Sequence, residues 1–212
     1  NGDENVSNGM ATATVSDVPY DITGDTIYVG DLRGDVYRID LTESTFNMEL
    51  MIKSIDPYKT AITTPIKLTQ YENFSSKTSD IMVHFGTGKF IENSDRSASS
   101  NSPQYIAGIF DRGIDSSEYP IDVVNDSRVV EQFVTSQVDG QRVLTNNPTD
   151  KQTDLGWRML LPDTGERIIT EMAYRFSAHF LIYSTYIPLG GSACSTGGAS
   201  WVMVVDNRTG GQ

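Results

Sequence analysis

Apolar and polar residues alternate with a period of two on either side of a short polar segment between Asp25 and Leu41. This period is typical of β-strands, and the segment Asp31–Asp35 contains Gly34, which can take the positive φ of a tight turn. The strand before the turn, which contains Ile27, is apolar on both faces, whereas the strand after it is apolar on only one. The pattern predicts a β-hairpin in a sheet whose inner strands are covered on both faces and whose outer strands face water.

The hairpin pattern occurs three times along the chain, each time as a short lead-in followed by two strands. The lead-ins are Ala13–Val15, Ile62–Ile66 and Ile168–Thr170, and the strand pairs are Ile27–Asp31 with Val36–Leu41, Asp80–Phe85 with Tyr105–Asp111, and Phe180–Tyr186 with Trp201–Asp206. Two further apolar segments, Met48–Ile52 and Met159–Leu161, are predicted as outermost strands. Repeated four-stranded units that cannot bury their faces alone are typical of a β-propeller.

The predicted fold is therefore all-β: a partial, modified β-propeller of about three four-stranded antiparallel blades with long loop insertions. The blade-like units span about 11–56, 61–135 and 156–212. Polar insertions at 92–102 and 111–154 account for the wide spacing, and within the second insertion 129–134 is either a short helix or a strand. Three blades do not close a ring, so missing blades, a partner chain or a cap must cover the apolar sheet faces at both ends.

The composition narrows the classes of partner. Acidic residues number 28 against 16 basic ones, which gives a net charge of −12 and opposes binding to nucleic acid or anionic lipid. No run of apolar residues is long enough for a membrane-spanning helix. The first residues, Asn1–Asn5, lack the basic and apolar regions of a signal peptide, and we expect the sequence to be a fragment of an exported protein.

Residues suited to catalysis are few. Cys194 is the only cysteine, so it has no intrachain disulfide partner, and no histidine or acid lies beside it in its loop of small residues. His84 and His179 both fall in strand patterns without a second histidine at ligand spacing. We therefore expect no enzymatic activity.

One loop has the spacing of a metal site. Asp17, Asp21 and Asp25 occupy positions 1, 5 and 9 of the segment before the first strand, and Thr23 would offer its carbonyl at position 7. Calcium-binding loops supply oxygen ligands from these positions. Pro19 stands at position 3 and donates no side-chain oxygen, and the alternative is that the aspartates stabilise turns at the entry of the strand. A calcium ion here would be structural or regulatory.

The predicted hairpin turn also contains a recognition motif. Arg33, Gly34 and Asp35 spell an integrin-binding tripeptide at the tip of the hairpin, where a receptor would reach it. The alternative is a turn that requires glycine between polar residues. Both readings stay open at this point.

A set of ordered segments resembles one protein family. They are Thr26–Leu41, Ile62–Pro65, His84–Phe90, Gly108–Asp111, Gly156–Trp157, Gly165–Thr170 and Cys194–Met203. The first, TIYVGDLRGDVYRIDL, is similar to a YVGDLxGxxxRxDL segment of the PilC/PilY family, the tip-associated adhesins of bacterial type IV pili. The resemblance implies the C-terminal modified β-propeller of such a protein, and a calcium loop to which Asp17, Asp21 and Asp25 correspond.

The resemblance also implies a function. We expect a non-enzymatic fragment of a pilus-tip adhesin that acts in pilus biogenesis, surface attachment and twitching motility, with calcium as a regulator. Its partners would be minor pilins, the rest of its own propeller or N-terminal region, and host or abiotic surfaces, at the pilus tip or outer membrane.

Two alternatives from other classes remain. A quinoprotein-like propeller dehydrogenase shares repeats that end in an aspartate followed by Thr-Gly, as Asp206–Gly211 does. Against it, the sequence shows no clustered acids, histidines or vicinal cysteines that would hold a quinone and its metal. The other alternative is a non-adhesive scaffold propeller within a larger extracellular assembly.

Overall fold

The structure is a computed structural model in which β-strands dominate. It describes residues 8–16, 25–41, 46–58, 60–71, 81–97, 103–113, 116–175, 178–189 and 197–212. One helix has its full bounds within these ranges, the short 3-10 turn η1 (Asn93–Arg96). No helix in the described residues is long and apolar enough to cross a bilayer.

The first sheet contains the hairpin that the alternation predicts. Its four antiparallel strands follow the chain in the order β1 (Thr14–Ser16), β2 (Thr26–Gly30), β3 (Val36–Asp40) and β4 (Asn47–Ile52). Gly34 lies in the turn between β2 and β3 with a φ of +85°. The first predicted unit, 11–56, is therefore one four-stranded sheet.

The second sheet has five strands rather than the four expected. Their order is β5 (Lys67–Gln70), β6 (Ile81–Gly86), β7 (Tyr105–Phe110), β11 (Gly156–Leu160) and β8 (Val129–Gln132). β8 runs parallel to β11, so this sheet is not purely antiparallel, and the segment 129–134 is extended rather than helical. The third predicted unit, 156–212, thus includes a strand of the second sheet, because the long insertion separates β7 from its partner β11.

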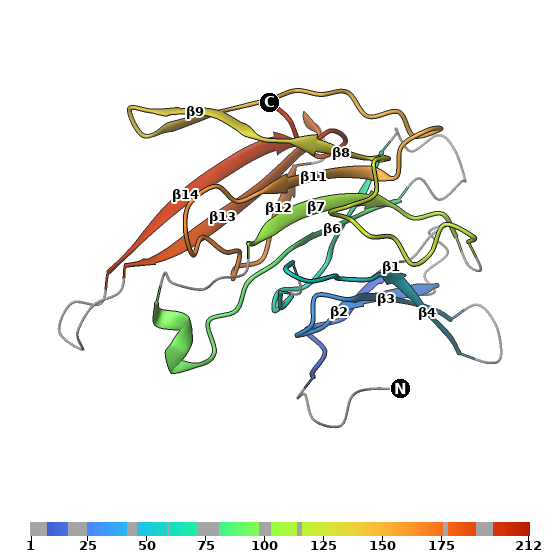
Figure 1. Ribbon diagram of the computed structural model, residues 1–212. Coiled ribbons are helices and arrows are strands. Elements are labelled where there is room, and N and C mark those ends of the chain that lie inside the picture. Colours follow the sequence, from blue (N-terminus) through green and yellow to red (C-terminus); the bar gives the residue numbers. More distant parts are fainter. Residues whose placement is uncertain are drawn as a thin grey trace.

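The third sheet has three strands within the described residues. They are β12 (Ala173–Arg175), β13 (Phe180–Leu189) and β14 (Gly197–Asp206), all antiparallel. The second insertion also forms a separate hairpin of β9 (Val134–Val138) and β10 (Gln141–Leu144). Figure 1 shows this hairpin above β14, with the C-terminal end of the chain close by.

The prediction of a strand is wrong for two of the three lead-in segments. Ile62–Ile66 and Ile168–Thr170 precede the innermost strands β5 and β12 instead of forming them. Ile62 packs on Gly30, where an added Cβ would lie 2.5 Å from the isoleucine, and Ile168 packs on Gly86, where the separation would be 2.6 Å. The N–H of each isoleucine also donates to the carbonyl that follows the glycine. The lead-ins therefore lock each sheet to the preceding one.

Two separate cores lie between the three stacked sheets (Figure 1). The core between the first and second sheets includes Tyr28, Val36, Met51, Val83, Phe85, Tyr105, Ala107 and Ile109. The core between the second and third sheets includes Met82, Ile106, Phe110, Trp157, Met159, Leu181, Tyr183, Met203 and Val205. Successive residues of β6 and β7 enter opposite cores, so both faces of the second sheet are buried.

Candidate functional site

The predicted calcium loop is described only at its ends. Asp17, Asp21 and Thr23 lie outside the described residues. The N–H of Asp25 donates to the carbonyl of Ser16 at 2.8 Å, so the β1–β2 pairing holds the two ends of the loop beside each other. No group of three or more histidine, cysteine or acidic residues in the described ranges has the arrangement of a metal site.

The receptor tripeptide lies in a packed turn. The backbone N–H groups of Arg33 and Asp35 both donate to the carboxylate of Asp31, at 2.8 and 2.9 Å. The Asp35 carboxylate accepts the N–H of Ser54 at 2.8 Å, and Gly34 is buried. The tripeptide is thus part of the contact between this turn and the segment after β4, and its role as a receptor contact stays a prediction.

A charged network joins the first and second sheets around Asp111. Tyr28 and Tyr119 donate their hydroxyls to its carboxylate, Gly113 donates its N–H, and Arg38 lies 3.3 Å away. Burial would raise the pKa of Asp111, but the charge of Arg38 and these hydrogen bonds outweigh it and lower the pKa. Removing either Asp111 or Arg38 would leave an unpaired buried charge, so the network couples the two sheets.

The later strands of the three repeats end in Asp40, Asp111 and Asp206, and two of these carboxylates contact the turn that follows the strand. Asp111 accepts the N–H of Gly113 at 2.9 Å, and Asp206 accepts the N–H of Arg208 at 2.8 Å. Asp40 instead pairs with an arginine of its own strand. The three carboxylates do not form a common acidic site.

An uncharged polar network joins the second and third sheets. His84 lies within hydrogen-bonding distance of the Thr69 hydroxyl, 2.8 Å from it, and Asn207 donates to the same hydroxyl. Trp157 donates its indole N–H to the carbonyl of Asn207 at 2.8 Å. Burial lowers the pKa of His84 to about 3, so the imidazole is neutral at physiological pH. Gly108 gives both rings room, because a Cβ there would lie 2.6 Å from each.

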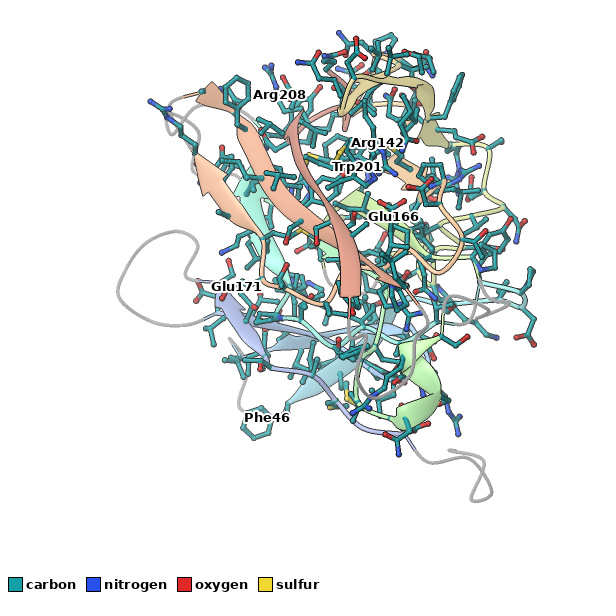
Figure 2. The ribbon with its side chains drawn as sticks, turned by 90° about the vertical axis from the view of Figure 1, so that its left-hand side faces the viewer. Phe46, Arg142, Glu166, Glu171, Trp201 and Arg208 are labelled. Atoms are coloured by element: carbon teal, nitrogen blue, oxygen red, sulfur yellow. The ribbon has the colours of Figure 1, made fainter. Side chains whose placement is uncertain are left out.

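An ion cluster fastens the β9–β10 hairpin to the third sheet (Figure 2). Arg142 donates to Glu166 at 2.6 Å and to Asp163 at 2.8 Å, and its guanidinium stacks 4.3 Å from the ring centre of Trp201. Its side chain and that of Glu166 are almost completely buried. The sequence does not predict this cluster, because its partners come from three separate segments without a common spacing, although Glu166 and Trp201 lie within the segments Gly165–Thr170 and Cys194–Met203.

The outer face of the first sheet is an open apolar surface. Val15, Ile27, Ile39 and Met48 pair across all four strands and form one row. Val15 is 56% exposed and Met48 57% exposed, whereas the other face of the same sheet lies in the first core. Phe46, which directly precedes β4 and is 82% exposed, projects outward from the first sheet (Figure 2).

The outer face of the third sheet is also open. Ala173, Ile182 and Val204 pair across its three strands, and Val202 lies on the same face two residues before Val204. Val202 is 73% exposed and Val204 48% exposed, while Met203 between them is buried. Apolar faces therefore end the stack on both sides, as the sequence predicts for an open propeller.

The open apolar faces are surfaces suited to binding. Asp111 with Arg38, Arg142 with Glu166, and His84 with Thr69 pair within the structure, and the exposed surfaces that stand out are apolar sheet faces. Such faces associate with other proteins or with further sheets of the same fold.

Comparisons with known proteins agree with this architecture. A family model described as the PilY1 beta-propeller domain matches residues 1–146. The type IV pilus biogenesis factor PilY1 of Pseudomonas aeruginosa (strain UCBPP-PA14) is 24% identical over 264 residues, which cover 98% of this chain and 22% of that protein. A PilY1 homolog of Xylella fastidiosa (strain Temecula1) is 27% identical over 196 residues, which cover 89% of this chain and 15% of that protein.

One solved structure has the same fold. The crystal structure of the Pseudomonas aeruginosa PilY1 C-terminal domain matches with a TM-score of 0.79 at 21% sequence identity, over 100% of this chain and 49% of that one. The chain spans only 22% and 15% of the length of these two curated relatives.

Proposed function

The chain belongs to the PilY1 beta-propeller family, and from this premise we propose that it is part of a type IV pilus biogenesis factor that also acts in tip adhesion, surface attachment and twitching motility. Two matched relatives are named as type IV pilus biogenesis factors. The proposed place of action is the bacterial surface, at the pilus tip or outer membrane. Minor pilins and host or abiotic surfaces are the proposed external partners.

The observation that carries this proposal is the pair of open apolar faces at the two ends of the stack. Val15 and Met48 mark one face, and Val202 and Val204 mark the other. A unit with both ends apolar works as an inner part of a larger assembly, and we propose that further blades of the same propeller cover these faces.

Two other functions have less support from the structure. A quinone-dependent dehydrogenase needs charged or metal-binding groups that face a cavity. Asp111 and Arg38 instead pair with each other between the first and second sheets. A scaffold propeller without adhesive function has the same architecture as an adhesin, so the distinction rests on cell assays.

The test uses cells that lack the gene, complemented with the full-length protein or with a version lacking residues 1–212. Surface pilin released by shearing and attachment per pilus are measured separately, with blotting to check that both proteins are exported in equal amounts. We expect the deletion to reduce surface pilin and attachment together. Normal piliation with normal attachment would refute the proposal, and normal piliation with lost attachment would restrict it to adhesion.

Calcium regulation is part of the proposal. The proposed ligands are Asp17, Asp21, Asp25 and the carbonyl of Thr23, and a bound cation would relieve repulsion among the three carboxylates. We expect a higher Tm with calcium than with excess chelator, and Asp25→Ala should remove the difference. Asp139→Asn, which removes one charge from the β9–β10 turn, is the control that should leave it intact. Equal melting in both conditions would reject the metal site.

A further inference from the structure

The second insertion, residues 111–154, is much longer than its connection requires. It leaves the second sheet after β7 and returns to it as β11, and these two strands are adjacent and antiparallel. A loop of a few residues can join such a pair. The insertion instead adds β8 to the second sheet and forms the β9–β10 hairpin, with β8 and β9 at the top of the view in Figure 1. Its other segments contact the two neighbouring sheets.

At its first contact the insertion extends the first sheet. The N–H of Ile121 donates to the carbonyl of Met51 at 2.9 Å, and the N–H of Lys53 donates to the carbonyl of Ile121 at 3.1 Å. Ile121 thus lies beside the edge strand β4, in parallel pairing with Ile52. The side chains of Ile121 and Val123 are almost completely buried in the core between the first and second sheets. This end of the insertion is therefore part of the joint between those two sheets.

Between its two ends the insertion is fixed to the second sheet and to itself. β8 pairs with β11 along its whole length. The Gln132 side-chain amide, which is buried, donates to the carbonyl of Asn147 at 2.7 Å and to the carbonyl of Thr209 at 2.9 Å. Its oxygen accepts the N–H of Asn147 at 3.0 Å. One buried side chain thus joins the start and the end of the insertion to the turn after β14.

At its last contact the insertion holds the third sheet. The Arg142 side chain on β10 is 2% exposed and pairs with Glu166, whose side chain is 0% exposed. Leu144, also on β10, is buried with side chains of β13 and β14 in the core between the second and third sheets. Beyond the hairpin, the Thr149 hydroxyl donates to the carbonyl of Arg208 at 2.9 Å, in the turn after β14. Ionic, apolar and hydrogen-bonding contacts therefore act together here.

The lead-ins fasten the same sheets at other strands. Ile62 packs on Gly30 at the end of β2, whereas Ile121 pairs with β4, two strands away in the first sheet. Ile168 precedes β12, the first strand of the third sheet, whereas the insertion contacts β14 and the turn after it, at the opposite edge. Each outer sheet is thus held at two separate strands. It cannot swing open about one fastening while the other holds.

We propose that the second insertion is a strap that makes the three sheets open as one unit. Stacked units that contact one another along a single interface can open one at a time, beginning at the ends. The strap adds a second fastening to both interfaces, and its β9–β10 hairpin is the part that closes on the third sheet. Such a unit would resist separation of its sheets under load, and the link to load rests on the surface attachment proposed above.

Hydrogen exchange of the full-length protein, resolved to single amides, tests whether the strap opens only with the sheet that it holds. We expect protection factors of hydrogen-bonded amides in the β9–β10 hairpin to agree within about tenfold with those in β13. Protection in the hairpin that is lower by about a hundredfold or more would show that it detaches alone, and would overturn the proposal. A difference of that size among β3, β7 and β13 would overturn it as well.

A pulling experiment tests the hold on the third sheet. Handles attached at positions 8 and 212 of the full-length protein load only this part of the chain, and we expect it to extend by about 70 nm in one step. Arg142→Ala combined with Glu166→Gln releases the hairpin without leaving an unpaired buried charge. In this double variant the third sheet should open first, in a separate step of about 17 nm.

The matched control is Val143→Thr, which changes an exposed side chain next to Arg142 on the same strand and should keep the single step. Separate steps in the wild type would show that the sheets open independently and would refute the proposal. A single step at unchanged force in the double variant would refute it too, because the hairpin would then carry none of the coupling. If the double variant does not fold, the exchange comparison in the wild type decides.

Discussion

The second and third sheets differ in how many of their faces are buried. Every residue of β6 and β7 is buried, and successive side chains enter two different cores. In β14, Met203 and Val205 are buried while Val202 and Val204 on the other face are exposed. The difference follows from position in the stack, because only the second sheet has a neighbour on each side. Mutations in the second sheet should therefore lower the stability of this chain, whereas mutations on the open faces of the first and third sheets should affect its association with further blades.

The two tryptophans give the largest expected contrast. Trp157 in the second sheet is completely buried and donates to the carbonyl of Asn207. We expect Trp157→Ala to lower the free energy of unfolding by about 3–5 kcal/mol, since it leaves a cavity and an unpaired carbonyl. Trp201 in the third sheet is only partly buried, and Trp201→Ala should cost less than half as much. Urea unfolding measures both, and equal losses would contradict the contrast.

A substitution at Gly86, on which Ile168 of the third lead-in segment packs, should have a smaller effect on the free energy of unfolding. A Cβ on Gly86 would lie 2.6 Å from Ile168, whereas Gly197 in β14 has only one side-chain atom nearby, at 4.0 Å. We expect Gly86→Ala to destabilise the protein by about 1–3 kcal/mol through overpacking between sheets. Gly197→Ala is the control and should have little effect. A Gly86→Ala variant that melts like the wild type would show that the lead-in contact is loose.

Acid should weaken the contact between the second and third sheets through His84. Its pKa is about 3 in the folded protein, below the unfolded value, so its contribution is complete above pH 6.5 and is lost as the pH falls toward 3. Between pH 7 and pH 5.5 the expected loss is about 1.3 kcal/mol, while most carboxylates stay ionised. His84→Gln should flatten this dependence, and the exposed Val202→Thr should leave it unchanged. Identical pH profiles for the wild type and His84→Gln would contradict the prediction.

Substitutions on the open faces should have the smallest effect on stability. Val202→Thr and Met48→Thr change exposed side chains, and we expect each to alter the free energy of unfolding of this chain by less than about 0.5 kcal/mol. In the full-length protein the same changes should cost more, because we propose that further blades cover these faces. Equal and small effects in both proteins would argue that the faces stay open.

Local patterns predicted the strands well. The alternation around Gly34 located β2 and β3 to within a residue, and the apolar segment Asp80–Phe85 was correctly predicted as a strand, β6. The lead-in Ile168–Thr170 was wrongly predicted as a strand, because an apolar β-branched segment has the same pattern whether it pairs within its own sheet or packs on a glycine of the preceding sheet.

Long-range partners could not be read from the sequence. The pairing of β11 with β7 spans the second insertion, and no local pattern encodes which strand lies at an edge. The Arg142 cluster brings together an insertion, a turn and β14, so its members share no spacing. The calcium ligands Asp17, Asp21 and Thr23 lie outside the described residues, and that site stays a prediction.

The central claim is that the second sheet is covered on both faces. Ile106 and Ala107 are neighbours that point into opposite cores. Single cysteines at these positions, in a Cys194→Ser background, should both resist a thiol reagent in the native protein, whereas a cysteine at Val202 should react at the rate of a free thiol. Rapid labelling at position 106 or 107 in the folded protein would show an open face on the second sheet and contradict the account.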